Sequence, residues 1–393
     1  MASSDKVLSD CINEFTVDIY KYVISEQFSG NVFMSPTSMM VVLTMLFVGA
    51  RKKTEDQMTQ ILKLEKLDKK AVLRDMETFV NTLKKGSKSV TLSTANRLFP
   101  NTSNIILEDY ISLVSEHFKA GVKSMDYTTN ADGARIEINK WVERETNSKI
   151  KDLLPKGSLG SDTVMVVVNA IYFKGNWETQ FEPKDTKKGT FTKLNSDKEL
   201  VDMMSRHMKK VKYGENRSLA CKTLELPYEG KELAMIIVLP RAHYGLPVLE
   251  KQLALENLRN LVSEIDPSTV DVSLPKFKLE TSLKLKKVLS DLGMNDLFLP
   301  HANLSGMGGD LYVSEVYHKA FVDVNEEGTE ATAATAAVVV TCSTKQTLLD
   351  FTADHPFLFM IWDHRLNVPL FIGRFVEPLN TAGPSFQQTK DEL

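Results

Sequence analysis

The amino-acid sequence predicts an α+β protein of 393 residues that folds as one large domain over residues 1–378. Three observations support this prediction: apolar residues at helical spacing near the N-terminus, short apolar runs typical of strands further along, and no Pro/Gly/Ser-rich break before Pro378. Length alone would allow two domains, but a chain without a linker favours one. Residues 379–393 are predicted to form a C-terminal tail.

The first predicted helix has an apolar stripe at intervals of three and four residues, which makes it amphipathic. The residues of this stripe are Leu8, Ile12, Phe15, Ile19 and Val23. Another helix is expected to begin at Thr54, because Thr54 and Gln57 form a capping-box pattern.

The strands are predicted from alternation and from apolar runs. Side chains alternate along residues 90–98, as in a strand with one buried face. Residues 163–173 are apolar almost throughout, which is typical of a strand buried on both faces. Further strands are expected within residues 232–240, 269–280 and 367–378.

Composition argues against several classes of protein. With 42% hydrophobic and 25% charged residues and a formal net charge of −3, the chain gives no reason to expect a nucleic-acid partner. The basic clusters at 63–88 and 206–212 are interpreted as solvated faces, with a polyanion site as the alternative. Because no stretch reaches the roughly 20 apolar residues that span a bilayer, no membrane insertion is expected.

The sequence contains none of the common motifs of enzymes or metal sites. The chain has no Gly-x-Ser-x-Gly elbow, no His-Glu-x-x-His, no phosphate-binding glycine loop and no Cys-x-x-Cys. Its seven histidines are scattered, and its three cysteines, Cys11, Cys221 and Cys342, have neither metal spacing nor an even number for a disulfide framework. We therefore expect no enzyme, no metal and no cofactor.

Residues 326–345, EEGTEATAATAAVVVTCSTK, have an unusual composition near the end of the domain. Alanine favours helix, whereas valine and threonine favour strand. The segment is nearly uncharged after its first acids and contains no proline. A strand that is exposed in one state and buried in another would need this composition.

Five motifs, in order and at consistent separations, show a resemblance to the serpins, a family of suicide protease inhibitors. They are NVFMSPTSMM from Asn31, INKWVERETNSKI from Ile138, NAIYFKGNW from Asn169, YHKAFVDVNEEGTEA from Tyr317 and DHPFLFMI…LFIGRFVEP ending at Pro378. The resemblance implies three β-sheets, eight or nine α-helices and an exposed reactive-centre loop near residues 326–350. It also implies a monomer that forms a covalent complex with its target protease.

In this family the cleaved loop inserts into the largest sheet as a central strand, here Thr329–Val339. The implied hinge residues are Glu326, Glu327, Gly328, Thr329, Glu330, Ala331, Thr332, Ala333, Ala334 and Thr335. Alternate residues of a strand share a face. From Thr329, one face carries only small or apolar uncharged side chains, whereas Glu330 lies on the other face.

The resemblance also locates the bait residue, which is the residue that the target protease takes into its primary specificity pocket. In inhibitory serpins the residue that enters the protease pocket lies fourteen positions after the hinge glycine, which gives Cys342 and a reactive bond between Cys342 and Ser343. The specificity residues are then Val339, Val340, Thr341 and Cys342. A small, weakly hydrophobic cysteine suits elastase-like or chymotrypsin-like serine proteases. Cleavage after Thr341, which presents Val340, would suit papain-like cysteine proteases.

Other residues match the positions that control opening of the sheet. Ser35, Ser38, Asn169 and His318 match the shutter. Trp177 matches the breach at the top of the sheet, and Glu326 is expected to pair with Lys276.

The tail ends in Lys390, Asp391, Glu392 and Leu393, a signal for retrieval to the endoplasmic reticulum. We expect the endoplasmic-reticulum lumen as the location and the KDEL receptor as a partner. Three sequons, at Asn101, Asn216 and Asn303, are candidate glycosylation sites in that compartment.

The N-terminal sequence does not fit this location, because it has no apolar leader. Either a signal peptide has been removed, or the protein is cytosolic and the tail is idle. Retention also raises an alternative function, that of a non-inhibitory chaperone serpin that binds collagen or other secretory clients. The uncharged face of the hinge favours an inhibitor.

Overall fold

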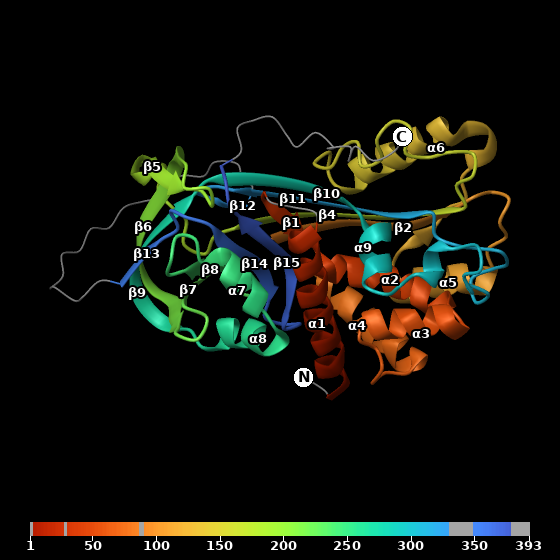
Figure 1. Ribbon diagram of the computed structural model, residues 1–393, viewed down its shortest axis with the longest axis horizontal. Coiled ribbons are helices and arrows are strands. Elements are labelled where there is room, and N and C mark those ends of the chain that lie inside the picture. Colours follow the sequence, from red (N-terminus) through yellow and green to blue (C-terminus); the bar gives the residue numbers. More distant parts are fainter. Residues whose placement is uncertain (1–2, 27–29, 86–89, 330–348, 379–393) are drawn as a thin grey trace.

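The structure is a computed structural model that describes residues 3–26, 30–85, 90–329 and 349–378 (Figure 1). Within these ranges, nine α-helices lie beside two β-sheets. The helices are α1 (Ser3–Glu26), α2 (Pro36–Gly49), α3 (Lys52–Ile61), α4 (Lys69–Lys84), α5 (Glu108–Phe118), α6 (Tyr127–Glu145), α7 (Leu246–Gln252), α8 (Leu255–Ser263) and α9 (Leu285–Asp291). None of these described helices is long and apolar enough to cross a membrane.

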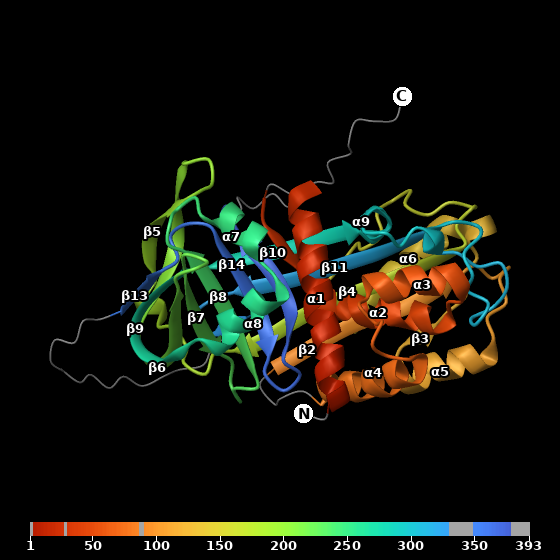
Figure 2. The same cartoon turned by 60° about the horizontal axis from the view of Figure 1, so that its bottom comes forward.

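The 6-stranded sheet has the order β10-β11-β12-β4-β2-β3, and β11 also pairs directly with β4. Its strands are β10 (Phe277–Lys284), β11 (Glu315–Val324), β12 (Gly328–Thr329), β4 (Met165–Asn176), β2 (Val90–Pro100) and β3 (Gly121–Val122). Figure 2 shows β4, β11 and β10 side by side across the molecule, with α2 next to them.

The 9-stranded sheet has the order β1-β15-β14-β8-β7-β6-β9-β13, with β5 paired to β6. Its strands are β1 (Val32–Met34), β15 (Val368–Phe375), β14 (Phe357–Asp363), β8 (Leu233–Pro240), β7 (Cys221–Pro227), β6 (Lys198–Asn216), β9 (Asp266–Pro275), β13 (Leu349–Thr352) and β5 (Lys187–Thr192).

The predicted fold class is confirmed, with two hydrogen-bonded sheets where three were expected. The long strand β6 pairs with β5, β7 and β9 and thereby joins strands that could otherwise form separate sheets. A register shift between Met208 and Val211 interrupts its pairing with β9. Because such a bulge bends a strand and increases its twist, one continuous sheet can cover two faces of the core.

The strand β4 is buried on both faces, as its apolar run predicts. Its odd-numbered residues, such as Val167 and Ile171, belong to the main core. Its even-numbered residues, such as Val168 and Tyr172, pack in a second cluster with Trp141 of α6. Helix α6 therefore covers the outer face of the 6-stranded sheet (Figure 1).

Two local predictions were wrong. The helix α3 begins at Lys52, and the Thr54 hydroxyl accepts a hydrogen bond from the backbone of Asn303 at 2.9 Å instead of capping the helix. Residues 269–280 do not form one strand but two, β9 and β10, which lie in different sheets. They separate at Lys276, whose backbone N–H bonds to the carbonyl of Asp202.

Candidate functional site

The short strand β12 lies between β11 and β4 at one end of the 6-stranded sheet. Thr329 is opposite Val324 of β11 and Gly175 of β4, and it runs antiparallel to both. Next to this point, beginning at Phe321 and Tyr172, β11 and β4 pair directly and in parallel. Gly328 and Thr329 therefore lie between β11 and β4 and stop where these two strands begin to pair directly. We call this two-residue insertion the β12 wedge.

A turn at Asn325 directs the chain into this wedge. The Asn325 side-chain oxygen accepts hydrogen bonds from the backbone N–H groups of Glu327 and Gly328. The backbone N–H of Asn325 donates to the Gly328 carbonyl at 2.9 Å. Gly328 has a φ of +156°, and a Cβ at this position would lie 2.1 Å from the Gly175 carbonyl oxygen. Only glycine fits so close to the neighbouring backbone.

Thr329 is fully buried, and its hydroxyl lies 2.8 Å from that of Tyr228. The Tyr228 ring stacks on Trp177, with 4.7 Å between the ring centroids. The Trp177 indole N–H in turn donates to the Asn325 carbonyl at 2.9 Å. The predicted breach residue Trp177 thus holds the turn from which the hinge starts.

The expected ion pair at the base of the hinge is present. Lys276 Nζ lies 2.8 Å from Glu326 Oε2, and the Thr186 hydroxyl donates to Glu326 Oε1 at 2.8 Å. Burial alone would raise the pKa of Glu326, but the hydrogen bonds from Lys276 and Thr186 hold it below its ordinary value. Glu326 is therefore ionised and tethered at neutral pH.

His318 on β11 is the centre of the predicted shutter. The ring is fully buried, and burial lowers its pKa to about 3, so the imidazole is neutral. The Ser35 backbone N–H donates to Nε2 at 3.3 Å, so Nε2 is unprotonated. The proton is then on Nδ1 and is donated to Asn169 Oδ1 at 2.5 Å. These contacts determine both the charge and the tautomer.

The other shutter residues continue this network. The Asn169 amide donates to Ser38 and to Asn96 Oδ1, and the Ser35 hydroxyl donates to the Leu370 carbonyl at 2.6 Å. Ser35 Oγ also caps α2 by accepting from the Ser38 N–H. The four predicted shutter residues are thus brought together, and they connect α2 to β4, β11 and β15.

Sequence reasoning missed Asn96 as a member of this network. Asn96 lies on β2 directly opposite Asn169 of β4. The alternation along residues 90–98 placed Asn96 on the same face as its apolar neighbours. A polar residue on a predicted buried face was therefore the signal, because buried amides need partners.

Many predicted functional residues lie outside the described residues. They are the hinge residues from Glu330 to Thr335, the specificity and reactive-bond residues from Val339 to Ser343, and the signal from Lys390 to Leu393.

Of the three sequon asparagines, Asn101 is poorly placed to receive a glycan. It is buried, and its amide nitrogen donates to Thr128 and to the Thr163 carbonyl. Asn216 and Asn303 are partly exposed.

The chain is similar to known inhibitors over most of its length. It is 41% identical over 383 residues to a leukocyte elastase inhibitor of Xenopus tropicalis, with 94% of this chain and 99% of the relative covered. It is 36% identical over 389 residues to human serpin B3, with the same coverage. Serpin48 of Tenebrio molitor superposes with a TM-score of 0.87 at 32% identity, covering 97% of this chain and 100% of that structure.

These relatives correct the predicted location. The chain matches elastase inhibitors and B-type serpins over nearly their whole length, and this group gives no support for targeting to the endoplasmic-reticulum lumen. The prediction was therefore wrong. The prediction relied on a C-terminal tetrapeptide that is recognised by a receptor. Such a signal has no effect unless the protein has first entered the lumen.

The family itself follows from a match that spans the folded domain. A family model described as serpin (serine protease inhibitor) matches residues 10–378, which include the β12 wedge and the whole shutter network. Together with relatives that are more than 30% identical over 94% of the chain, this match shows that the protein belongs to the serpins, the serine protease inhibitors.

Proposed function

We propose that this serpin is a suicide inhibitor that is cleaved between Cys342 and Ser343 and traps the acylated protease by inserting Thr329–Val339 into the 6-stranded sheet. The observation that carries the proposal is the β12 wedge, in which Gly328 and Thr329 already pair with β4 and Thr329 also pairs with β11. An inserting strand would only have to extend a ladder that has begun.

The register of β12 supports a specific inserted arrangement. In an antiparallel ladder, each step forward along one strand is a step back along its partner. Continued from Thr329, the ladder would place Thr335 opposite Asn169 of β4 and His318 of β11, the shutter pair. The inserted strand would then separate Asn169 from His318, so the hydrogen bond between them has to break before the strand can insert.

The burial of the neighbouring strands explains the composition of the hinge. Alternate residues from Thr329 would face the main core, between side chains such as Ile171 and Ala320 that are already buried. Small, uncharged residues suit such a position because a buried unpaired charge is costly. Glu330 would lie on the outer face between Lys174 and Asp323, both of which are partly exposed.

The proposed bait residues set the target class. A small cysteine at position 342 would enter the pockets of elastase-like or chymotrypsin-like serine proteases. This choice agrees with relatives that are named leukocyte elastase inhibitors. A second mode, cleavage after Thr341 with Val340 presented to a papain-like cysteine protease, is proposed with the same inserting strand.

The test combines the site of cleavage with the fate of the loop. The protein is incubated with an elastase-like protease, covalent complex is measured on denaturing gels, and the released peptide is identified by mass spectrometry. We expect a stable complex and a peptide that begins at Ser343. A papain-like protease should instead release a peptide that begins at Cys342.

A paired thermal melt of intact and loop-cleaved protein tests insertion directly. Replacing the direct β4–β11 pairing by two antiparallel ladders would add roughly ten backbone hydrogen bonds, at about 1 kcal/mol net each. The cleaved protein should therefore melt at least about 10 °C higher than the intact protein. Equal midpoints, or a peptide that begins only after Lys345, would contradict the mechanism and the target class respectively.

A further inference from the structure

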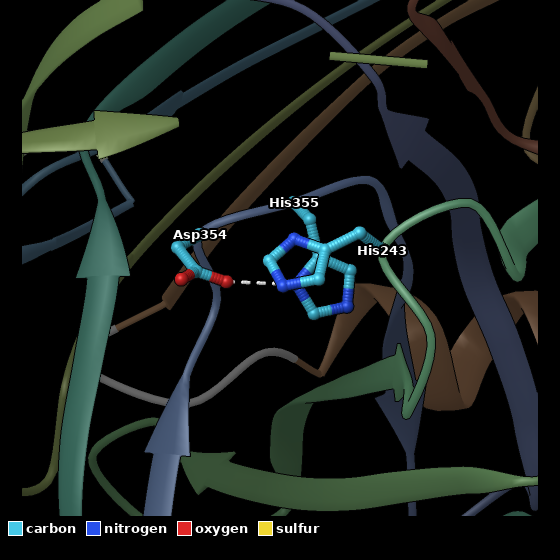
Figure 3. Close-up of side chains that lie close together, drawn as sticks. All are labelled: His243, Asp354 and His355. Atoms are coloured by element: carbon cyan, nitrogen blue, oxygen red, sulfur yellow. Dashed lines mark hydrogen bonds and ion pairs between the residues drawn. The ribbon is translucent and has the colours of Figure 1, made fainter. Parts of the chain in front are cut away.

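Three side chains from two distant parts of the sequence, His243, Asp354 and His355, lie together next to the end of β8 in the 9-stranded sheet (Figure 3). His243 comes from the loop between β8 and α7, whereas Asp354 and His355 come from the connection between β13 and β14. Their nitrogen and oxygen ligand atoms all lie within 4.8 Å of one another. Among the residues that the structure describes, this is the one group of at least three histidine, cysteine or carboxylate side chains with such geometry.

His355 has the orientation of a metal ligand. Its ring is only 6% exposed, and Nε2 lies 2.7 Å from the Pro240 carbonyl oxygen. A carbonyl can only accept, so Nε2 carries a proton, and Nδ1 is the nitrogen that faces Asp354, at 2.7 Å from Oδ1. Metal-bound histidines almost always donate their second N–H to a carbonyl or carboxylate in this way.

The other two ligands can complete the site with small movements. A tetrahedral ion with bonds of about 2.1 Å needs ligand atoms roughly 3.4 Å apart. The His243 ring lies over His355, with 4.5 Å between the centroids, and it is exposed on a loop. The Asp354 carboxylate is 38% exposed, while its backbone carbonyl is fixed by the Thr192 N–H at 2.8 Å.

We propose that His243, Asp354 and His355 bind a divalent transition-metal ion of the Zn²⁺ class, with the fourth position open to water. Two imidazoles and one carboxylate suit such an ion, whereas Mg²⁺ and Ca²⁺ prefer oxygen ligands. The ion would lie between Asp354 Oδ1 and His355 Nδ1, two atoms that already face each other at 2.7 Å. Sequence motifs did not indicate this group, because His243 comes close to Asp354 and His355 only in the folded chain.

The position of the site suggests what the ion stabilises. Asp354 and His355 directly follow β13, an edge strand whose described partner is β9. An ion shared with His243 ties this connection to the β8–α7 loop. Because the ion binds the folded protein, thermal stability should rise with the logarithm of the ion concentration once that concentration exceeds the Kd.

The test is calorimetric titration of the full chain with ZnCl₂, with MgCl₂ as the selectivity control. A Cys342→Ser variant is titrated in parallel, so that binding to the thiol of the proposed reactive loop is recognised separately. We expect one Zn²⁺ per chain at this site in both proteins. His243→Ala should fold, because His243 is exposed, and should weaken binding beyond the roughly 10- to 100-fold that loss of a second-shell partner costs.

The matched control is His301→Ala, which removes another exposed histidine beside a carboxylate, 3.7 Å from Asp296. It should bind Zn²⁺ and gain thermal stability with Zn²⁺ as the wild type does, whereas His243→Ala and Asp354→Asn should bind Zn²⁺ much more weakly and gain correspondingly less stability. The visible absorption of bound Co²⁺ gives a readout that does not depend on stability. The proposal is overturned if no saturable binding occurs, or if His243→Ala binds as tightly as His301→Ala.

Discussion

Acidification should loosen the shutter through His318. The neutral ring accepts from the Ser35 N–H and donates to Asn169, so a second ring proton would end the first contact and place a charge in the core. His318 is fully buried, and burial lowers its pKa to about 3, compared with about 6.5 for an unperturbed histidine. Lowering the pH therefore tests the shutter through the protonation of one defined side chain, His318.

The sign follows from proton binding in the two states. Between about pH 6.5 and 3 the unfolded chain binds the His318 proton and the folded protein does not, so the free energy of unfolding falls as the pH falls. The contribution is fully present above pH 6.5 and is lost at about 1.4 kcal/mol per pH unit below it. Acidification from pH 6.5 to 5 should thus cost about 2 kcal/mol through this residue.

The assay is urea unfolding of wild type and of His318→Gln between pH 7.5 and 5. Glutamine can accept from the Ser35 N–H through its side-chain oxygen but does not titrate. We expect the variant to be less stable at pH 7.5 and to have a shallower pH dependence, with the difference in slope close to the value above. His207→Gln, which removes an exposed histidine beside Asp271, is the surface control measured in parallel.

Parallel pH profiles for wild type and His318→Gln would refute this reasoning. They would mean either that the folded protein takes up the proton readily or that His318 is not neutral at pH 7.5.

Three further changes test the hinge and the bait. Thr329→Arg would place an unpaired charge at a fully buried position beside Tyr228, so the yield of gel-stable protease complex should fall sharply; an undiminished yield would exclude insertion from this point. Lys276→Met would leave the largely buried Glu326 carboxylate without its cation and should lower the thermal midpoint by about 1–3 °C, a shift that differential scanning calorimetry can detect. Mild peroxide should slow inhibition by the wild type through oxidation of Cys342, whereas Cys342→Ala should be insensitive; equal sensitivity would remove this thiol from the mechanism.

The sequence predicted the features that depend on neighbours along the chain. The stripe of the first helix is buried as expected, from Leu8 to Val23, and the apolar run at 163–173 became the doubly buried strand β4. Five motifs along the chain also indicated the family. The ion pair between Glu326 and Lys276 was also predicted, because the resemblance to the serpins indicated which strand lies next to Glu326.

The tertiary structure decided the features that depend on contacts between distant segments. Thr54 became a partner of Asn303 instead of a helix cap, and Asn101 was buried although its sequon suggested exposure. The protonation state of His318 follows from its desolvation and from the Ser35 N–H, neither of which any local pattern records. The position of Gly328 beside β4 and the cluster of His243 with His355 likewise depend on contacts between distant segments. Periodicity reports which side of an element is buried, whereas hydrogen-bond partners, pKa values and ligand geometry are set by whichever segments the fold brings within a few ångströms.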